Sequence, residues 1–171
     1  MNQAGAHEYG KGDLLIRDAR VIDGTDAPVR NGLSILVRDG VIQEIAADIE
    51  ANGTPQLDVT GACVIPGLIE SHMHLMWGPG VMLHHQGKPT EEDWTRTWGR
   101  NYKQHLRAYL ACGVTTIHDV AAFPFVVREV RRHYAEGGVG PRFLALGPMI
   151  SPPKGYANAL EACVTSEEDV E

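Results

Sequence analysis

Apolar and polar residues alternate along the first third of the chain, which is the pattern of half-buried β-strands. Leu33, Ile35 and Val37 recur at every second position, so their side chains share one face of an extended strand. Asp39-Gly40 follows this run, and both residues tolerate a positive φ, as a tight two-residue hairpin turn requires. The sequence therefore predicts an antiparallel hairpin whose second strand covers residues 41–45.

Two shorter apolar runs precede the hairpin, at residues 14–16 and 21–22, and predict two further strands on either side of a polar stretch. Asparagine–glycine and threonine–glycine pairs later in this region supply additional turns. We expect residues 13–61 to form a small antiparallel β-sandwich-type domain of about four strands. Residues 1–12 are polar and contain glycine, and we expect a flexible tail there.

From residue 62 onward the pattern changes to strands that alternate with helices. An apolar run at residues 63–69, a β-branched run at 114–118 and an apolar run at 143–146 predict three strands. Strands separated by helices pair in parallel through right-handed crossovers. Such a series begins either a doubly wound sheet or a (β/α)8 barrel. A barrel of about 250 residues has eight units of roughly 31 residues, so residues 62–171 would supply about three of them.

The segments between these strands carry helix signals. Thr90 is expected to cap a helix with Asp93 as its reciprocal partner, and Gly113 is expected to end that helix. Pro124 suits the first turn of a second helix, and residues 165–169 resemble the start of a third. The first helix has an apolar stripe that repeats every four residues and indicates a packing face. The stripe consists of Trp94, Trp98, Tyr102 and Leu106.

Two histidines stand one residue apart after the first strand of this second region. His72 and His74 would share one face of an extended chain, together with Glu70. A divalent metal ion held there could polarise a carbonyl and lower the pKa of a bound water to about 7, which is hydrolase chemistry. A His-x-His pair alone is weak evidence, and its position after an apolar strand is what favours a metal site. His118 and Asp119 end the next strand and are candidates for a supporting or substrate-contacting role, although packing is the commoner role for such a histidine.

Composition and charge argue against several classes of function. The chain has 171 residues and a formal net charge of −7, whereas nucleic-acid and anionic-membrane binders need clustered Lys and Arg. No stretch approaches the roughly 18 consecutive apolar residues of a membrane span, and no signal-peptide core is present, so we expect a cytoplasmic protein. The three cysteines are far apart and odd in number, so buried thiols are expected rather than disulfides. They are Cys63, Cys112 and Cys163.

Five motifs follow one another along the chain: Val37-Arg38-Asp39-Gly40-Val41-Ile42, Asp58-Val59-Thr60-Gly61-Ala62, Pro66-Gly67-Leu68-Ile69-Glu70-Ser71-His72-Met73-His74, Gly113-Val114-Thr115-Thr116-Ile117-His118-Asp119 and Gly140-Pro141-Arg142-Phe143-Leu144-Ala145. In this order they resemble the N-terminal portion of the amidohydrolase superfamily of metal-dependent hydrolases. The last two of them resemble barrel strands of the branch that includes imidazolonepropionase-like and Xaa-Pro dipeptidase-like enzymes. The resemblance implies that residues 13–61 are the N-terminal half of a urease-α-like composite domain. It also implies that residues 62–171 are the first βα units of a TIM-type (β/α)8 barrel.

The same resemblance implies that His72 and His74 bind one or two divalent ions, most often Zn²⁺. The family's remaining ligands follow later barrel strands, and its general-base aspartate follows the eighth. These positions would lie beyond residue 171, so no catalytic acid or base is identified in this chain. The sequence departs from the family pattern where Glu70 replaces an aspartate and where His118 replaces a more frequent arginine.

Two function hypotheses remain open. The first is a metal-dependent hydrolase of carbon–nitrogen bonds other than ordinary peptide bonds, acting on small cyclic amides, amidines or dipeptides through metal-activated water. The second is a catalytically incomplete fragment or pseudo-enzyme that acts as an interaction module, because two histidines fall short of the three or four ligands of a zinc site. A nucleotide-binding domain is weaker, since no Gly-rich turn follows the first strand. We expect a small-molecule substrate, no nucleic-acid or membrane partner, and leave a homo-oligomer open.

Overall fold

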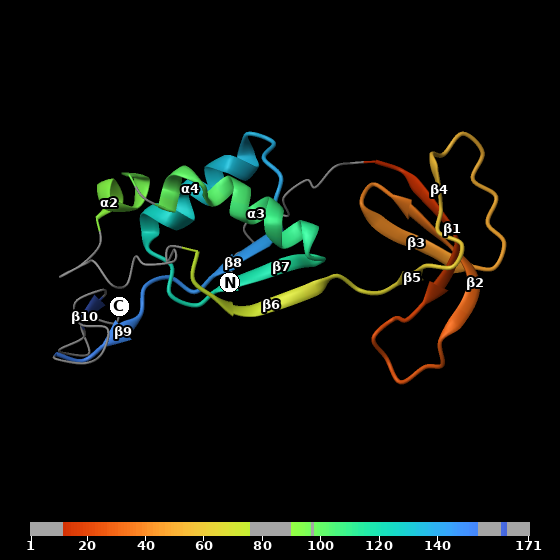
Figure 1. Cartoon of the computed structure of the whole chain (residues 1–171), viewed down its shortest axis with the longest axis horizontal. Helices are drawn as coiled ribbons and strands as arrows, with labels where there is room; N and C mark the ends of the chain where they lie inside the picture. Colours follow the sequence, from red (N-terminus) through yellow and green to blue (C-terminus); the bar gives the residue numbers. More distant parts are fainter. Residues whose placement is uncertain (1–11, 76–89, 97, 154–161, 164–171) are drawn as a thin grey trace. The chain divides into compact units, whose positions relative to one another are not determined.

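The computed structural model describes residues 12–75, 90–96, 98–153 and 162–163. The chain divides into two compact units, Met1–Pro66 and Gly67–Glu171. The first unit contains a β-sheet, and the second contains a parallel sheet with helices (Figure 1). No helix in the described part of the chain is long and apolar enough to cross a membrane.

The first unit is a five-stranded sheet in the order β3-β2-β1-β4, with β5 also paired to β1. The sequence predicted only antiparallel strand pairs in this domain, whereas the structure also contains parallel pairs. β1 pairs antiparallel with β2 but parallel with β4 and β5, so β1 is bonded on both of its edges. The strands are β1 (Leu14–Val21), β2 (Arg30–Arg38), β3 (Val41–Ala46), β4 (Gln56–Asp58) and β5 (Cys63–Val64).

β1 is continuous, whereas the sequence predicted two short strands there. Asp18 has a φ of 55°, and the register with β2 shifts between Ile16 and Ala19. This irregularity is a β-bulge, which inserts a residue without ending the strand. Leu15 and Ala19 remain fully buried on either side of it. The bulge therefore accommodates the polar residues that interrupted the apolar pattern.

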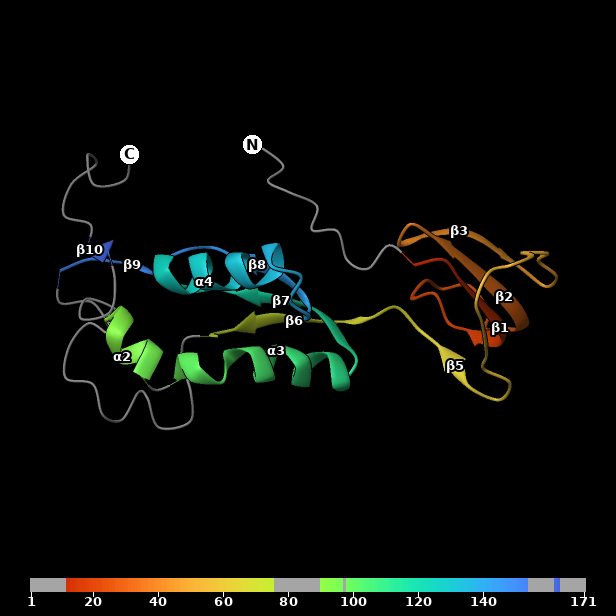
Figure 2. The same ribbon diagram turned by 90° about the horizontal axis from the view of Figure 1, so that it is seen from above.

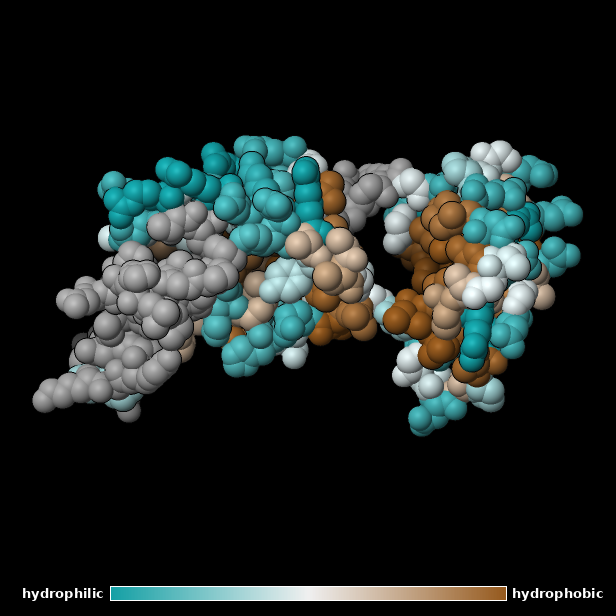
Figure 3. All heavy atoms as spheres, in the orientation of Figure 1, coloured by the Kyte–Doolittle hydropathy of each residue, from teal (hydrophilic) through white to brown (hydrophobic). Residues whose placement is uncertain are grey.

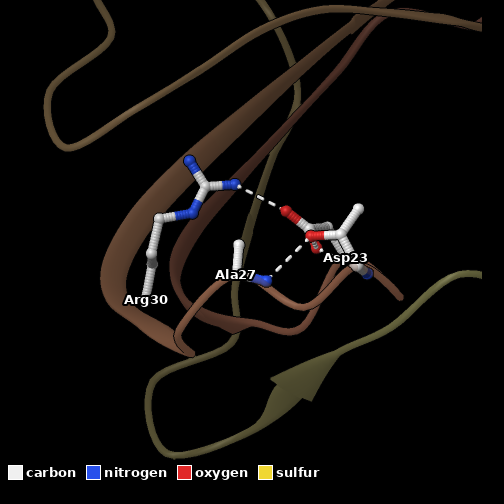
Figure 4. A network of polar contacts seen from close by, with 4 residues as sticks. Asp23, Ala27 and Arg30 are labelled. Carbon is white, nitrogen blue, oxygen red and sulfur yellow. Dashed lines mark hydrogen bonds and ion pairs between the residues drawn. The ribbon is translucent and has the colours of Figure 1, made fainter.

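The turns of the first unit follow from local chemistry. The hairpin predicted at Asp39-Gly40 is confirmed, since the two residues have φ values of 50° and 74° between β2 and β3. The loop between β1 and β2 is organised by the Asp23 carboxylate, which accepts hydrogen bonds from the Thr25 backbone N–H at 3.0 Å and hydroxyl at 2.6 Å. Arg30 donates to the other carboxylate oxygen at 3.3 Å (Figure 4). These bonds, the Thr25 hydroxyl first, lower the pKa of Asp23.

The second unit contains three parallel strands in the order β6-β7-β8, which confirms the predicted parallel pairing. Helices α3 and α4 cover one face of this sheet (Figures 1 and 2). The strands are β6 (Leu68–Met73), β7 (Val114–Asp119) and β8 (Arg142–Ala145). The remaining elements are α2 (Glu91–Arg96), the 3-10 helix η1 (Trp98–Arg100), α3 (Tyr102–Ala111), α4 (Pro124–Ala135), and the parallel pair β9 (Ile150–Ser151) and β10 (Ala162–Cys163).

Two sequence predictions about element boundaries were wrong. The apolar run at residues 63–69 is divided between β5 in the first unit and β6 in the second. Pro66 lies between them and has no N–H to donate to a strand ladder. The single helix expected after Thr90 is divided into α2, η1 and α3. A Cβ at Gly99 would lie 2.7 Å from the Trp94 ring, so the chain turns closely over Trp94 there.

Other local signals are confirmed. The Thr90 hydroxyl accepts a hydrogen bond from the Asp93 N–H at 3.1 Å, and the Asp93 carboxylate accepts one from the Thr90 N–H at 3.1 Å. Gly113 follows α3 with a φ of 80°, and Pro124 begins α4. Cys63 and Cys112 are exposed, contrary to the buried thiols expected from their neighbours. The helix expected at residues 165–169 lies outside the described residues.

The core of the second unit lies between the sheet and its helices. Ile117 of β7 faces α3 and α4 and is fully buried. By alternation Thr116 and His118 point to the other side of the sheet, where Ile69 is 67% and Leu144 42% exposed. We call this side, with those four residues, the open face. Figure 3 shows apolar surface near β6. The helix-side core includes Leu75, Leu106, Ile117, Phe123, Val126 and Val130.

Candidate metal centre

The two histidines singled out by the sequence stand at the C-terminal end of β6. His72 is within the strand, and His74 follows its last residue. Met73, between them, packs into the core and is 8% exposed. Because side chains alternate along a strand, His72 and His74 point away from that core. Their ring centroids are 5.3 Å apart, with the planes at 86°.

This separation fits a shared metal ion. Zinc binds imidazole nitrogens at about 2.0–2.1 Å in tetrahedral geometry, and such bonds hold two ring centroids about 5 Å apart. The observed 5.3 Å agrees with that value. In the described part of the chain no group of three or more His, Cys, Asp or Glu side chains could hold a metal. The described residues therefore supply two imidazole ligands and not a complete coordination sphere.

Asp119 lies beside His74 at the end of β7. It pairs in register with Met73 on β6 and is fully buried. One carboxylate oxygen accepts a hydrogen bond from the Leu75 N–H at 2.9 Å, and the other accepts one from the Ala121 N–H at 3.1 Å. Burial raises the pKa of Asp119, whereas these two hydrogen bonds and the neighbouring imidazoles favour its ionised form.

His74 approaches the same carboxylate through Nδ1. The distance from Nδ1 to Asp119 Oδ1 is 3.9 Å, which is too long for a hydrogen bond. Nδ1 is nevertheless buried, and it has no hydrogen-bond partner among the described residues. The side chain as a whole is 31% exposed. The imidazole thus has one buried nitrogen beside a carboxylate, while the rest of the ring reaches the surface.

The surroundings of Glu70 and His118 differ from those of the two metal-ligand candidates and Asp119. The Glu70 carboxylate accepts a hydrogen bond from the His72 backbone N–H at 3.0 Å, so it binds the main chain of its own strand. His118 is half-buried on the open face, and its imidazole favours the ionised form of Asp119. The structure therefore brings His72, His74 and Asp119 together at adjoining strand ends.

The contact of the Leu75 backbone with Asp119 had no signal in the sequence. The Leu75 backbone N–H holds Asp119, and Leu75 itself is 1% exposed in the core. An apolar residue directly after the histidine pair indicates burial, but nothing in the pattern indicates which acceptor its N–H meets. Only the pairing of β6 with β7 brings the two residues together.

Comparison with known proteins gives partial matches. No protein-family model matches the sequence. A dihydroorotase from Citrifermentans bemidjiense is 44% identical over 70 residues, which are 40% of this chain and 16% of that protein. A solved Xaa-Pro dipeptidase with bound methionine superposes with a TM-score of 0.70 at 24% identity, over 94% of this chain and 39% of that one. A solved molinate hydrolase superposes with a TM-score of 0.67 at 19% identity, over 95% of this chain and 37% of that one. The chain thus spans less than half the length of each of these three proteins.

Proposed function

The chain belongs to the amidohydrolase superfamily and corresponds to the N-terminal portion of its members, and from this premise we propose that the protein is a metal-dependent hydrolase. Its substrates are small molecules with a carbon–nitrogen bond other than an ordinary peptide bond, such as a cyclic amide, an amidine or a small dipeptide. The observation that carries the proposal is the pair His72 and His74, which end a parallel strand with their rings 5.3 Å apart.

The parallel sheet is, in this proposal, the first three βα units of a (β/α)8 barrel. Its support is the order β6-β7-β8 with helices on one face, together with superpositions that span most of this chain. Barrel enzymes place their active sites at the C-terminal ends of the strands. His72, His74 and Asp119 all stand at such ends. The open face would then point into the barrel, and the first unit would be half of a composite β domain.

His72 and His74 would each hold the ion through one ring nitrogen. Zn²⁺ suits two imidazole donors at this separation. When bound, the ion would polarise a substrate carbonyl or amidine and lower the pKa of a water. The buried Asp119 carboxylate lies 3.9 Å from His74 Nδ1, and Glu70 holds the main chain at His72. None of the described residues is assigned as the general base that this chemistry requires.

A non-catalytic interaction module is the second candidate. The observation in its favour is that the described residues provide two ligands and no third, whereas catalytic zinc sites use about three protein ligands. Such a module would bind zinc weakly and turn over no substrate. The two candidates therefore differ in metal stoichiometry as well as in activity.

The test compares His72→Ala with a matched histidine variant on the helix side of the sheet, His105→Gln of α3. Metal content is measured by elemental analysis after dialysis, and turnover is measured on a panel of cyclic amides, amidines and Xaa-Pro dipeptides. We expect His72→Ala to lose bound zinc and at least about 100-fold in turnover, because it removes a direct ligand. His105→Gln should retain both.

Normal metal content and turnover in His72→Ala would refute the metal assignment. Weak zinc binding and no turnover in the unaltered protein would instead favour the interaction module. Stoichiometric tight zinc with turnover of any panel member would exclude that module.

A further inference from the structure

Asp119 has an unusual environment for a carboxylate. Among the described residues it is the only Asp or Glu that is buried, and its exposure is 0%. Burying an ionised carboxylate is unfavourable unless hydrogen bonds replace the lost water. The groups that replace water around the Asp119 carboxylate therefore indicate the role of this residue.

The contacts of Asp119 join the ends of all three parallel strands. Its carboxylate accepts the N–H of Leu75, just after β6, and the N–H of Ala121, just after β7. Its main-chain carbonyl accepts the N–H of Leu146, just after β8, at 3.0 Å. Next to it, the Val120 N–H donates to the Met73 carbonyl at 3.2 Å. One residue thus fixes the starting points of three loops at the end of the sheet where the histidines stand.

The remaining side of the carboxylate faces His74. Oδ1 lies 3.9 Å from Nδ1, and that nitrogen is buried without a hydrogen-bond partner among the described residues. A histidine that binds a metal through Nε2 commonly donates its Nδ1–H to a carboxylate, which fixes the tautomer and the ring orientation. The 3.9 Å gap exceeds hydrogen-bond length by about 1 Å.

We propose that Asp119 is a positioning residue that acts through His74, by holding the imidazole with Nδ1 toward the sheet and Nε2 toward the metal. This inference rests on the proposed function, because it assumes that His74 is a ligand. A purely structural role, in which Asp119 only anchors the loops, would use the same two backbone hydrogen bonds. The test must therefore separate loop anchoring from an effect on His74.

Asp119→Asn is the informative variant, because an amide retains the size but has only one acceptor oxygen. Its matched control is Val130→Ala, which loosens the same core from α4, at a fully buried position. Zinc affinity is measured by chelator competition in both variants and in His74→Ala with and without Asp119→Asn. We expect Asp119→Asn to weaken zinc binding about 10- to 100-fold and Val130→Ala to change it less than twofold. With His74→Ala present, Asp119→Asn should add less than a further twofold.

Equal zinc affinity in Asp119→Asn and the unaltered protein would overturn the proposal, as would an undiminished effect of Asp119→Asn when His74 is absent. These results differ from a failure of the proposed function, in which His74→Ala itself would leave zinc binding unchanged. If Asp119→Asn does not fold, the tautomer of His74 in the metal-free unaltered protein still decides the matter by long-range proton–nitrogen NMR. The Nδ1–H tautomer supports the proposal, and the Nε2–H tautomer contradicts it.

Discussion

Replacing Gly67 with alanine is expected to separate β6 from β7 where the histidine-bearing strand begins. A Cβ at residue 67 would lie 2.0 Å from Oγ1, 2.4 Å from Cγ2 and 2.7 Å from Cβ of Thr115. Rotating the threonine side chain cannot relieve the last of these contacts, so backbone must move. The Leu68 N–H donates to the Gly113 carbonyl at 2.9 Å beside this point, and that bond would be strained first.

The size of the effect follows from two opposing terms. Gly67 is not among the glycines with positive φ, so alanine fits its backbone and gains about 0.4–1 kcal/mol by restricting the unfolded chain. Overpacking of a well-packed contact costs about 1–3 kcal/mol. Because the overlap reaches a backbone-fixed carbon, the cost dominates, and we expect a net loss of about 1–2 kcal/mol. For a chain of this size that loss lowers Tm by roughly 2–8 °C.

Thermal and urea unfolding followed by circular dichroism would measure this loss. Gly12→Ala is the matched control, since a Cβ there meets no heavy atom within 4 Å, and it should change stability by less than about 0.5 kcal/mol. Thr115→Gly removes the three heavy atoms nearest to a Cβ at residue 67. Gly67→Ala should therefore cost at least about 1 kcal/mol less when Thr115→Gly is present. An equal loss with and without Thr115→Gly, or no loss at all, would refute the steric argument.

Two further predictions concern the second unit. Burial, and then the Glu129 carboxylate, raise the pKa of Tyr102. The folded state therefore holds the phenol proton more tightly than the unfolded state does. Because of this difference, the free energy of unfolding falls as pH rises above about 10. Tyr102→Phe should reduce the loss of unfolding free energy between about pH 9 and 11, and an unchanged urea-unfolding profile would count against it. The 171-residue chain alone should self-associate in sedimentation experiments, because Ile69 and Leu144 are exposed on the open face and β8 has no described neighbour beyond β7. Ile69→Thr should weaken that association, and a monodisperse, cooperatively melting monomer would contradict the prediction.

Local signals allowed part of the fold to be predicted from the sequence. The Asp39-Gly40 turn, the Thr90 cap and the Gly113 helix end each depend on residues close together in the chain, and all three are confirmed. The parallel order of the second sheet follows from strands that alternate with helices. Hydrophobic pattern was insufficient at Pro66, where one apolar run serves two sheets. It was also insufficient at Gly99, where tertiary contact with Trp94 accompanies the break in the helix.

The candidate metal centre shows the same division between local and long-range information. Alternation along a strand predicted that His72 and His74 share a face, and their ring geometry agrees with that interpretation. The role of Asp119 could only be named as a candidate, because its bond to the Leu75 N–H joins residues 44 positions apart. That contact depends on the register of β6 against β7 and on a closed core behind them. Neither is encoded in a short sequence window.

The bonding of β1 on both edges also sets an order of events during synthesis. The pairings of β2 with β3 and with β1 join neighbouring segments and can form early, whereas the other edge of β1 must wait for β5, which pairs residues 20 and 21 with residues 63 and 64. The first sheet is therefore completed only after residue 64 has left the ribosome, when the histidine strand has already been translated. The second sheet has to wait for β8 at residue 142. We expect the growing chain to pass through a stage in which the first unit is folded while His72 and His74 are still accessible to solvent and to stray metal ions.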